Sequence, residues 1–397
     1  MPGPGVTSRL KRWINDAVVA LLNLERRIDP YFRDVFDRVF QRPLVRVTQA
    51  LINFKRPDEG LGIAEERLLP DEEELTRGIT DTMAEFLRRT YPHGGAERAG
   101  NTKTYGVVRA EFAVRADLPE AMRVGVFAEP RTYRAWVRFG GPGPRTPPDI
   151  KDKGILSIGI KVMGVDGPKL IDDERWTQDF TGISAPTFTT PNIRENLKLQ
   201  RALLAGWPIL YFLNPLDSHL RDAVMQGLYA RTQANPLEAR YWSCAAYLLG
   251  DGRAMQYSVR PRSPGRTKVR WNPPPNYLRG AMARTLATTD VELDFMIQVQ
   301  TDPYRMPVEN GSVEWPERLS PFVPAATLRI PQQRFDSAAQ LAFAHNLSYN
   351  PWHAIPEHRP LGNQNRARRT IYLELSKLRQ EMNGERRIEP TGNERFD

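Results

Sequence analysis

VRFGGPGPRTPPDIKDKGILSIGIKVMGVDG, residues 137–167, contains two runs of strand-forming residues separated by a connector rich in proline and glycine. The first run completes the segment 133–139, in which two sets of residues alternate: Arg134, Trp136 and Arg138 against Tyr133, Ala135, Val137 and Phe139. Successive side chains of a strand point to opposite faces, so the two sets should lie on different faces of a sheet. The stretch therefore predicts two strands joined by a loop.

Further short runs rich in Val, Tyr and Phe occur at 105–114, 123–129, 254–261, 291–301 and 325–331. Helical patterns interrupt them at 193–213 and 218–233, without a regular alternation of strand and helix. Parallel sheets need such alternation, so antiparallel pairing is favoured. We expect an α+β fold: a large antiparallel β-barrel with inserted and appended α-helices.

The chain begins with a helical pattern from Ser8 to about Phe54, whose apolar residues recur every three or four positions. One interpretation is a helix packed on the body of the protein. The other is a helix in peripheral contact with a membrane, because basic residues flank the apolar ones: Lys11, Arg12, Arg26 and Arg27. Further helices are expected at 71–92 and 371–382.

Three regions follow from these patterns. Residues 1–70 form a helical arm and connector, 71–372 form the barrel with its inserted helices, and 373–397 form the end of a helix and a disordered tail.

The composition excludes several classes of function. The net charge is +9, yet the 56 basic residues are scattered among 47 acidic ones and form no run interleaved with aromatics, so nucleic-acid binding is not expected. Cys244 is the only cysteine, which excludes intrachain disulfides and cysteine-based metal clusters. Without a signal peptide or a long apolar segment, we expect a soluble cytoplasmic protein.

The sequence resembles the haem catalases in several segments. Residues 137–167 are similar to the catalase stretch VRFSTVAG and the following RDPRGFAVKFY. Residues 97–114, ERAGNTKTYGVVRAEFAV, resemble the catalase motif RVVHAKGAGAFGYFEV. Residues 177–189, TQDFTGISAPTFT, take the place of the catalase stretch GNNTPVFF. Residues 358–362, HRPLG, fall where catalases have HRxRLG. The likeness runs from Glu97 to Tyr372 and is closer to catalase-like haem proteins that lack the full catalytic set. It implies haem b in the mouth of the barrel.

The resemblance also assigns the catalytic positions. Asn101 stands where catalases place the distal histidine that moves the peroxide proton, and an amide cannot accept and return a proton near pH 7. Thr102 adds a hydroxyl beside it, and Ser184 or Ile183 falls at the place of the catalase distal asparagine. Efficient catalase activity is therefore not expected.

Three arginines match those that catalases direct at the haem propionates: Arg98, Arg138 and Arg359. A planar guanidinium pairs with a carboxylate through two hydrogen bonds, which suits this role.

The proximal ligand lies within HNLSYNPWHAIPEHRPLG, residues 345–362. Catalases ligate iron with a tyrosinate in the pattern RxxxYxDxHRxRLG. A register fixed on Leu361 and Gly362 makes His353 the ligand, whereas matching SYNP makes Tyr349 the ligand and puts His345 in place of the arginine. We favour His353, because neutral imidazole ligates iron readily whereas tyrosinate needs a nearby cation, and Tyr349 remains the alternative.

The resemblance implies a haem-dependent peroxidase or hydroperoxide-converting enzyme that acts on organic or fatty-acid hydroperoxides. A haem-binding protein without turnover, acting as a sensor, store or scavenger, is the alternative. A barrel that has lost haem and binds an apolar ligand is a third possibility, against which the proximal cluster argues.

Overall fold

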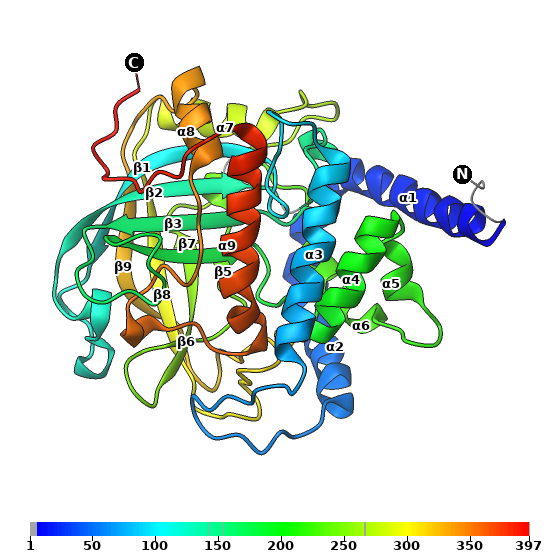
Figure 1. Ribbon diagram of the computed structural model, residues 1–397, viewed down its shortest axis with the longest axis horizontal. Coiled ribbons are helices and arrows are strands. Elements are labelled where there is room, and N and C mark those ends of the chain that lie inside the picture. The colour runs from blue at the N-terminus through cyan, green and yellow to red at the C-terminus, as the bar shows by residue number, and fades with distance from the viewer. Residues whose placement is uncertain (1–5, 142, 153, 266, 397) are drawn as a thin grey trace.

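An antiparallel β-barrel occupies the centre of the structure, a computed structural model that describes residues 6–141, 143–152, 154–265 and 267–396 (Figure 1). Its strands are β1 (Thr104–Val114), β2 (Thr132–Gly140), β3 (Ser157–Met163), β4 (Thr177–Ile183), β5 (Tyr241–Trp242), β6 (Tyr247–Leu248), β7 (Ala254–Pro261), β8 (Val291–Val299) and β9 (Val323–Ile330). Among the described residues, eight strands close in the order β5-β4-β3-β2-β1-β9-β8-β7, because β5 also pairs with β7. The expected α+β barrel is confirmed.

Side chains fill the interior of the barrel. An aromatic cluster lies at its centre, with Phe180 and Phe295 at 4.9 Å between ring centroids and Phe112 and Phe295 at 5.2 Å. The predicted alternation in β2 is confirmed, since Ala135, Val137 and Phe139 belong to this core whereas Trp136 lies in a separate cluster on the outer face. The outer face is buried as well, along all of β3 and along β2 from Trp136 onward.

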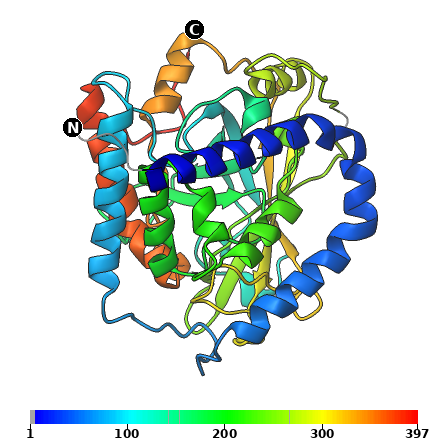
Figure 2. The same cartoon turned by 90° about the vertical axis from the view of Figure 1, so that its right-hand side faces the viewer.

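Helices surround the barrel: α1 (Val6–Phe36), α2 (Arg42–Lys55), α3 (Glu72–Thr90), α4 (Ile193–Ala205), α5 (Ile209–Leu213), α6 (Leu220–Tyr229), α7 (Tyr277–Leu286), α8 (Ala338–Asn346) and α9 (Asn363–Asn383). A π-helical segment, η1 (Asp37–Gln41), joins α1 to α2. α9 crosses the outer face of the barrel and packs beside α3, which also contacts α4 (Figure 1). α1 and α2 form an arc along one side of the molecule (Figure 2). None of the helices in the described part of the chain is long and apolar enough to cross a membrane.

Several elements differ from the sequence prediction. Residues 123–129 do not form a strand; they contain a short 3₁₀ turn, because Gly125 adopts a φ of +57° and packs against the His358 ring. Strand β4 and helices α7 and α8 were not predicted. Residues 350–354 form a turn in which the Asn350 side chain accepts a hydrogen bond from the Trp352 amide.

The C-terminal segment, expected to be disordered, packs against the barrel as far as residue 396. Trp136 Nε1 donates to Glu394 at 2.8 Å, and Glu389 accepts from the amides of Arg175 and Trp176. The expected boundary at 372/373 falls inside α9, which is continuous there. Residues 1–5 and 397, the outer ends of the expected arm and tail, lie outside the described residues.

Candidate functional site

A cavity of about 370 Å³ lies between the outer face of β3 and β4 and the helices α3, α4 and α9. Its walls are largely apolar: Ile79, Met83, Ile158, Ile183, Phe188, Leu199, Ile371 and Leu375. The resemblance implied a cofactor in the mouth of the barrel, but this cavity lies outside the filled barrel interior, beneath α9.

The sheet register explains the hollow in the cavity floor. Arg138, Gly159 and Thr181 are cross-strand partners on β2, β3 and β4, and all three line the cavity. A Cβ atom at residue 159 would lie 2.8 Å from the Tyr349 ring, so the close packing of this ring requires glycine. Tyr349 therefore forms part of the cavity wall.

One face of α9 forms the opposite wall. The residues that line the cavity recur at the spacing of helical turns: Gln364, Arg368, Ile371, Tyr372, Leu375 and Arg379. The Arg368 guanidinium lies 5.6 Å from the centroid of the Tyr372 ring and 4.5 Å from that of Phe188. Burial alone would lower the pKa of Arg368, but the neighbouring tyrosines, Tyr372 foremost, outweigh it and raise that pKa.

Three guanidinium groups at this cavity, those of Arg98, Arg138 and Arg368, form no ion pair with any carboxylate of the described residues. Arg138, only 5% exposed, donates to the Asn101 carbonyl at 2.6 Å and to the Thr104 hydroxyl at 2.9 Å. Arg98 donates to the carbonyls of Ala344 and Leu347.

The electrostatics of this group point to a ligand. Burial, reinforced by the neighbouring Arg98, holds the pKa of Arg138 well below its usual range. Buried charges are normally paired, so unpaired guanidinium groups favour an anionic ligand at this place.

Buried polar atoms without partners also surround the cavity. The Ser157 and Ser348 hydroxyls and the Asn350 amide nitrogen find no hydrogen-bond partner within the described ranges, and all three residues line the cavity. Because buried polar atoms in folded proteins are nearly always satisfied, these groups indicate a place for water or ligand.

Of the predicted catalytic residues Asn101, Thr102 and Ser184, the structure brings only Asn101 to the cavity, which the apolar Ile183, the alternative to Ser184, also lines. Asn101 has a φ of +48°, a conformation that asparagine adopts more readily than most residues. Thr102 is buried, and its hydroxyl donates to the Arg98 carbonyl. The Ser184 hydroxyl accepts from the Leu156 amide at 2.8 Å, and Ser184 borders a different cavity, next to α2.

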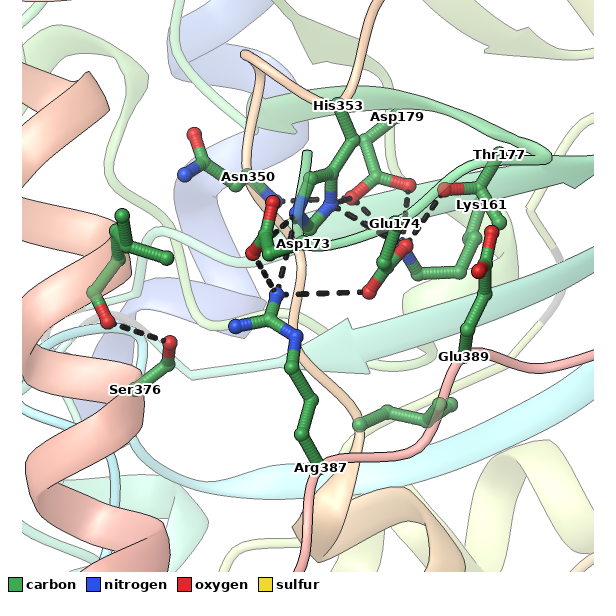
Figure 3. A network of polar contacts seen from close by, with 12 residues as sticks. Lys161, Asp173, Glu174, Thr177, Asp179, Asn350, His353, Ser376, Arg387 and Glu389 are labelled. Carbon is green, nitrogen blue, oxygen red and sulfur yellow. Dashed lines mark hydrogen bonds and ion pairs between the residues drawn. The ribbon is translucent and has the colours of Figure 1, made fainter. Parts of the chain in front are cut away.

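The predicted axial ligand His353 does not fit that role. It is fully buried away from the cavity, with Nδ1 2.7 Å from Asp179 and Nε2 3.1 Å from Asp173 (Figure 3). A nitrogen already bonded to a carboxylate is not available to an iron.

His353 instead belongs to a buried ion network (Figure 3). Lys161 and Asp179 face each other across β3 and β4, and the Lys161 ammonium pairs with Asp179 at 2.8 Å and with Glu174. Glu174, Asp179 and His353 lie close enough together to hold a cation, but the Lys161 ammonium already occupies their centre. The network fixes the segment after α8 to the barrel.

Some of the other predicted cofactor-binding residues lie at the cavity and others do not. Arg98 and Arg138 lie at the cavity, whereas Arg359 forms a partly exposed ion pair with Glu66 at 2.7 Å. His358 packs in the barrel core, where burial lowers its pKa to about 4. Tyr349 lines the cavity, but burial, with a further contribution from Asp179, raises its pKa and favours the neutral phenol.

The prediction missed Arg368 and Tyr372, although the signal for them was present. The segment RARRTIY contains arginine four residues before tyrosine, the spacing that places both on one helical face. Alignment of the catalase pattern at Leu361 and Gly362 placed the predicted ligand before α9 instead.

No protein-family model and no curated protein matches the sequence. Solved structures do match. A fungal catalase superposes with a TM-score of 0.57 at 14% identity, covering 82% of this chain and 67% of that chain. Catalase A from Saccharomyces cerevisiae superposes with a TM-score of 0.57 at 14% identity, covering 82% of this chain and 69% of that chain. A bacterial catalase superposes with a TM-score of 0.55 at 14% identity, covering 84% of this chain and 67% of that chain. The chain has the fold of these proteins.

Proposed function

We propose that this chain, which has the catalase fold, binds haem b in the cavity beneath α9 and uses it to convert organic or fatty-acid hydroperoxides. The observation that carries the proposal is the set of unpaired guanidinium groups around an apolar cavity that also contains a tyrosine next to an arginine. Haem presents the complementary chemistry, since it combines an apolar ring, two carboxylates and an iron.

Particular residues suit each part of haem. Arg98 and Arg138 would hold the propionates, because a guanidinium pairs with a carboxylate through two hydrogen bonds. Tyr372 would ligate the iron in place of His353 or Tyr349, since its hydroxyl makes no hydrogen bond with a described residue and Arg368 supplies the cation that a tyrosinate needs. The only cysteine is buried, which supports non-covalent haem b.

Bound haem supplies an iron that cleaves O–O bonds. Asn101 would hydrogen-bond an oxygen of the substrate but cannot move a proton between its oxygens. Thr102 and Ser184 use their hydroxyls elsewhere. Disproportionation of hydrogen peroxide should consequently be slow, while the apolar wall formed by Met83, Phe188 and Leu199 suits a hydroperoxide with a hydrocarbon chain.

The alternative is a haem protein without turnover that serves as a sensor, store or scavenger. It is supported by the small number of polar groups at the cavity, because of Asn101, Thr102 and Ser184 only Asn101 reaches it. A passive binder needs no further polar group there.

The test begins with an absorption spectrum of the full chain, produced with haem supplied. A stoichiometric Soret band is expected, and a fatty-acid hydroperoxide should change the spectrum and yield product, whereas hydrogen peroxide should be consumed slowly. A Soret band without product would support the passive binder. A folded protein without the band would refute haem binding.

A further inference from the structure

The N-terminal arc, comprising α1, η1 and α2, is held to the body of the protein through polar groups. Asp29, which is fully buried, accepts from the Thr232 amide, and Arg33 donates to the Ala230 carbonyl at 2.8 Å while pairing with Asp37 at 2.6 Å. In α2, the Gln49 side chain accepts from the Glu314 amide at 2.9 Å. The inward face of the arc is therefore largely polar.

Most of the large apolar side chains of the arc point away from the protein, although Ile52 of α2 is buried against Met225 and Val313. The outward-pointing side chains recur at intervals of three, four or eight residues and are exposed, Trp13 by 68% and Phe54 by 88%: Leu10, Trp13, Leu21, Leu24, Ile28, Tyr31, Val35, Val39, Val47, Leu51 and Phe54. An amphipathic helix on a globular protein normally buries its apolar face against the core. This reversed orientation leaves an extended apolar surface, which marks an interaction site.

The exposed charges of the arc are mainly basic: Lys11, Arg12, Arg27, Arg38, Arg42, Arg46 and Lys55. None of these seven forms an ion pair within the described part of the chain. The exposed acids are Asp16 and Asp34, and Asp34 is paired with Arg231 at 2.9 Å. The apolar surface is thus bordered by uncompensated positive charge.

The surface is broad rather than a narrow seam. α5 contacts α1 and α6 contacts α2, and these helices lie on the same side of the molecule (Figure 2). Leu216, in the loop between α5 and α6, is 94% exposed. A broad apolar face with a basic border fits the plane of a bilayer, where apolar side chains enter the acyl boundary and bases meet lipid phosphates.

We propose that the N-terminal arc docks the protein on the surface of an anionic membrane. Pairing with a second copy is disfavoured, because it would bring the unpaired bases of two arcs together, and like charges across an interface repel. The proposal does not depend on haem binding.

The test is co-sedimentation of the full chain with vesicles of phosphatidylcholine, with or without phosphatidylglycerol. Binding to phosphatidylglycerol vesicles is expected, with weakening in high salt. The double variant Leu21→Glu/Val35→Glu should bind at least about tenfold more weakly. Arg27→Gln and Arg38→Gln should each weaken binding to anionic vesicles about fivefold.

Trp176→Glu serves as the matched control, because Trp176 is exposed outside the arc, in the segment that contacts Glu389. It should bind like the unaltered chain, and circular dichroism should show that all variants are folded. Absence of vesicle binding would overturn the proposal. So would a dimer in sedimentation velocity that the double variant converts to a monomer while binding no vesicles.

Discussion

Arg368 lies one helical turn before Tyr372 on α9, with its guanidinium carbon 5.6 Å from the centre of the tyrosine ring, and both side chains line the cavity. In the proposed function, Tyr372 takes the place of His353 as the ligand of the iron. Arg368 supplies a cation next to a phenol whose hydroxyl has no partner among the described residues, whereas His353 is enclosed by carboxylates.

Tyr372→Phe should remove the axial ligand and abolish or strongly weaken haem retention, without unfolding the barrel. Tyr349→Phe is the matched control, because Tyr349 lines the same cavity but favours the neutral phenol. The readouts are the ratio of Soret to protein absorbance and the charge-transfer bands. If Tyr372→Phe retains haem and Tyr349→Phe loses it, Tyr349 and not Tyr372 is the ligand of the iron.

Arg138→Met should lower haem affinity by roughly tenfold or more, since a charge-assisted hydrogen bond to a propionate would be lost. Arg359→Met should leave affinity unchanged, because Arg359 pairs with Glu66 away from the cavity. Titration of the haem-free protein with haem measures both. Equal losses would contradict the assignment of Arg138 to the propionates.

Asn101→His should raise hydrogen-peroxide turnover, because an imidazole at the cavity can accept and return a proton. Asn101→Gly, which keeps the positive φ at no steric cost, controls for backbone effects. Oxygen release at fixed haem content is the measurement. No gain in the histidine variant would mean that residue 101 does not face the bound peroxide.

Stability should depend on pH through His353. Burial and Lys161 act to lower the pKa of His353, but Glu174, Asp179 and Asp173 outweigh them and raise it. A raised folded-state pKa gives stability that is complete below the unfolded value of about 6.5 and is lost as pH rises through the folded value.

The free-energy difference between the unaltered chain and His353→Gln should therefore be larger at about pH 6 than at about pH 9. Urea unfolding measures it, with the exposed His93 replaced by glutamine as control. A difference that grows with pH would reverse the assigned sign.

Lys161→Met should destabilise the fold by about 3 to 5 kcal/mol, because it removes the buried ammonium that pairs with both Glu174 and Asp179. Lys151→Met, at an exposed lysine of the loop before β3, should change the free energy of unfolding by less than about 0.5 kcal/mol. A small effect of Lys161→Met in urea unfolding would mean that the two carboxylates are protonated in the folded state.

The sequence by itself determined the antiparallel barrel, the alternation in β2 and the positions of the main helices. These features depend on local patterns: a period of two residues in strands, a period near 3.6 in helices, and short motifs that resemble those of catalases and occur in the same order. Asn101, Arg98 and Arg138 were located for the same reason, since they lie in or next to those segments.

Only the tertiary structure decided which polar groups meet. His353 and Asp179 are far apart in sequence, and the burial that joins them to Lys161 could not be deduced from the spacing of histidines. Ser184 and Arg359 likewise found partners away from the cavity, while Tyr372 was brought to it by the packing of α9 against α3 and α4. The outward orientation of the N-terminal arc was also undetermined, because helical periodicity defines an apolar face but not the side of the helix that meets the protein.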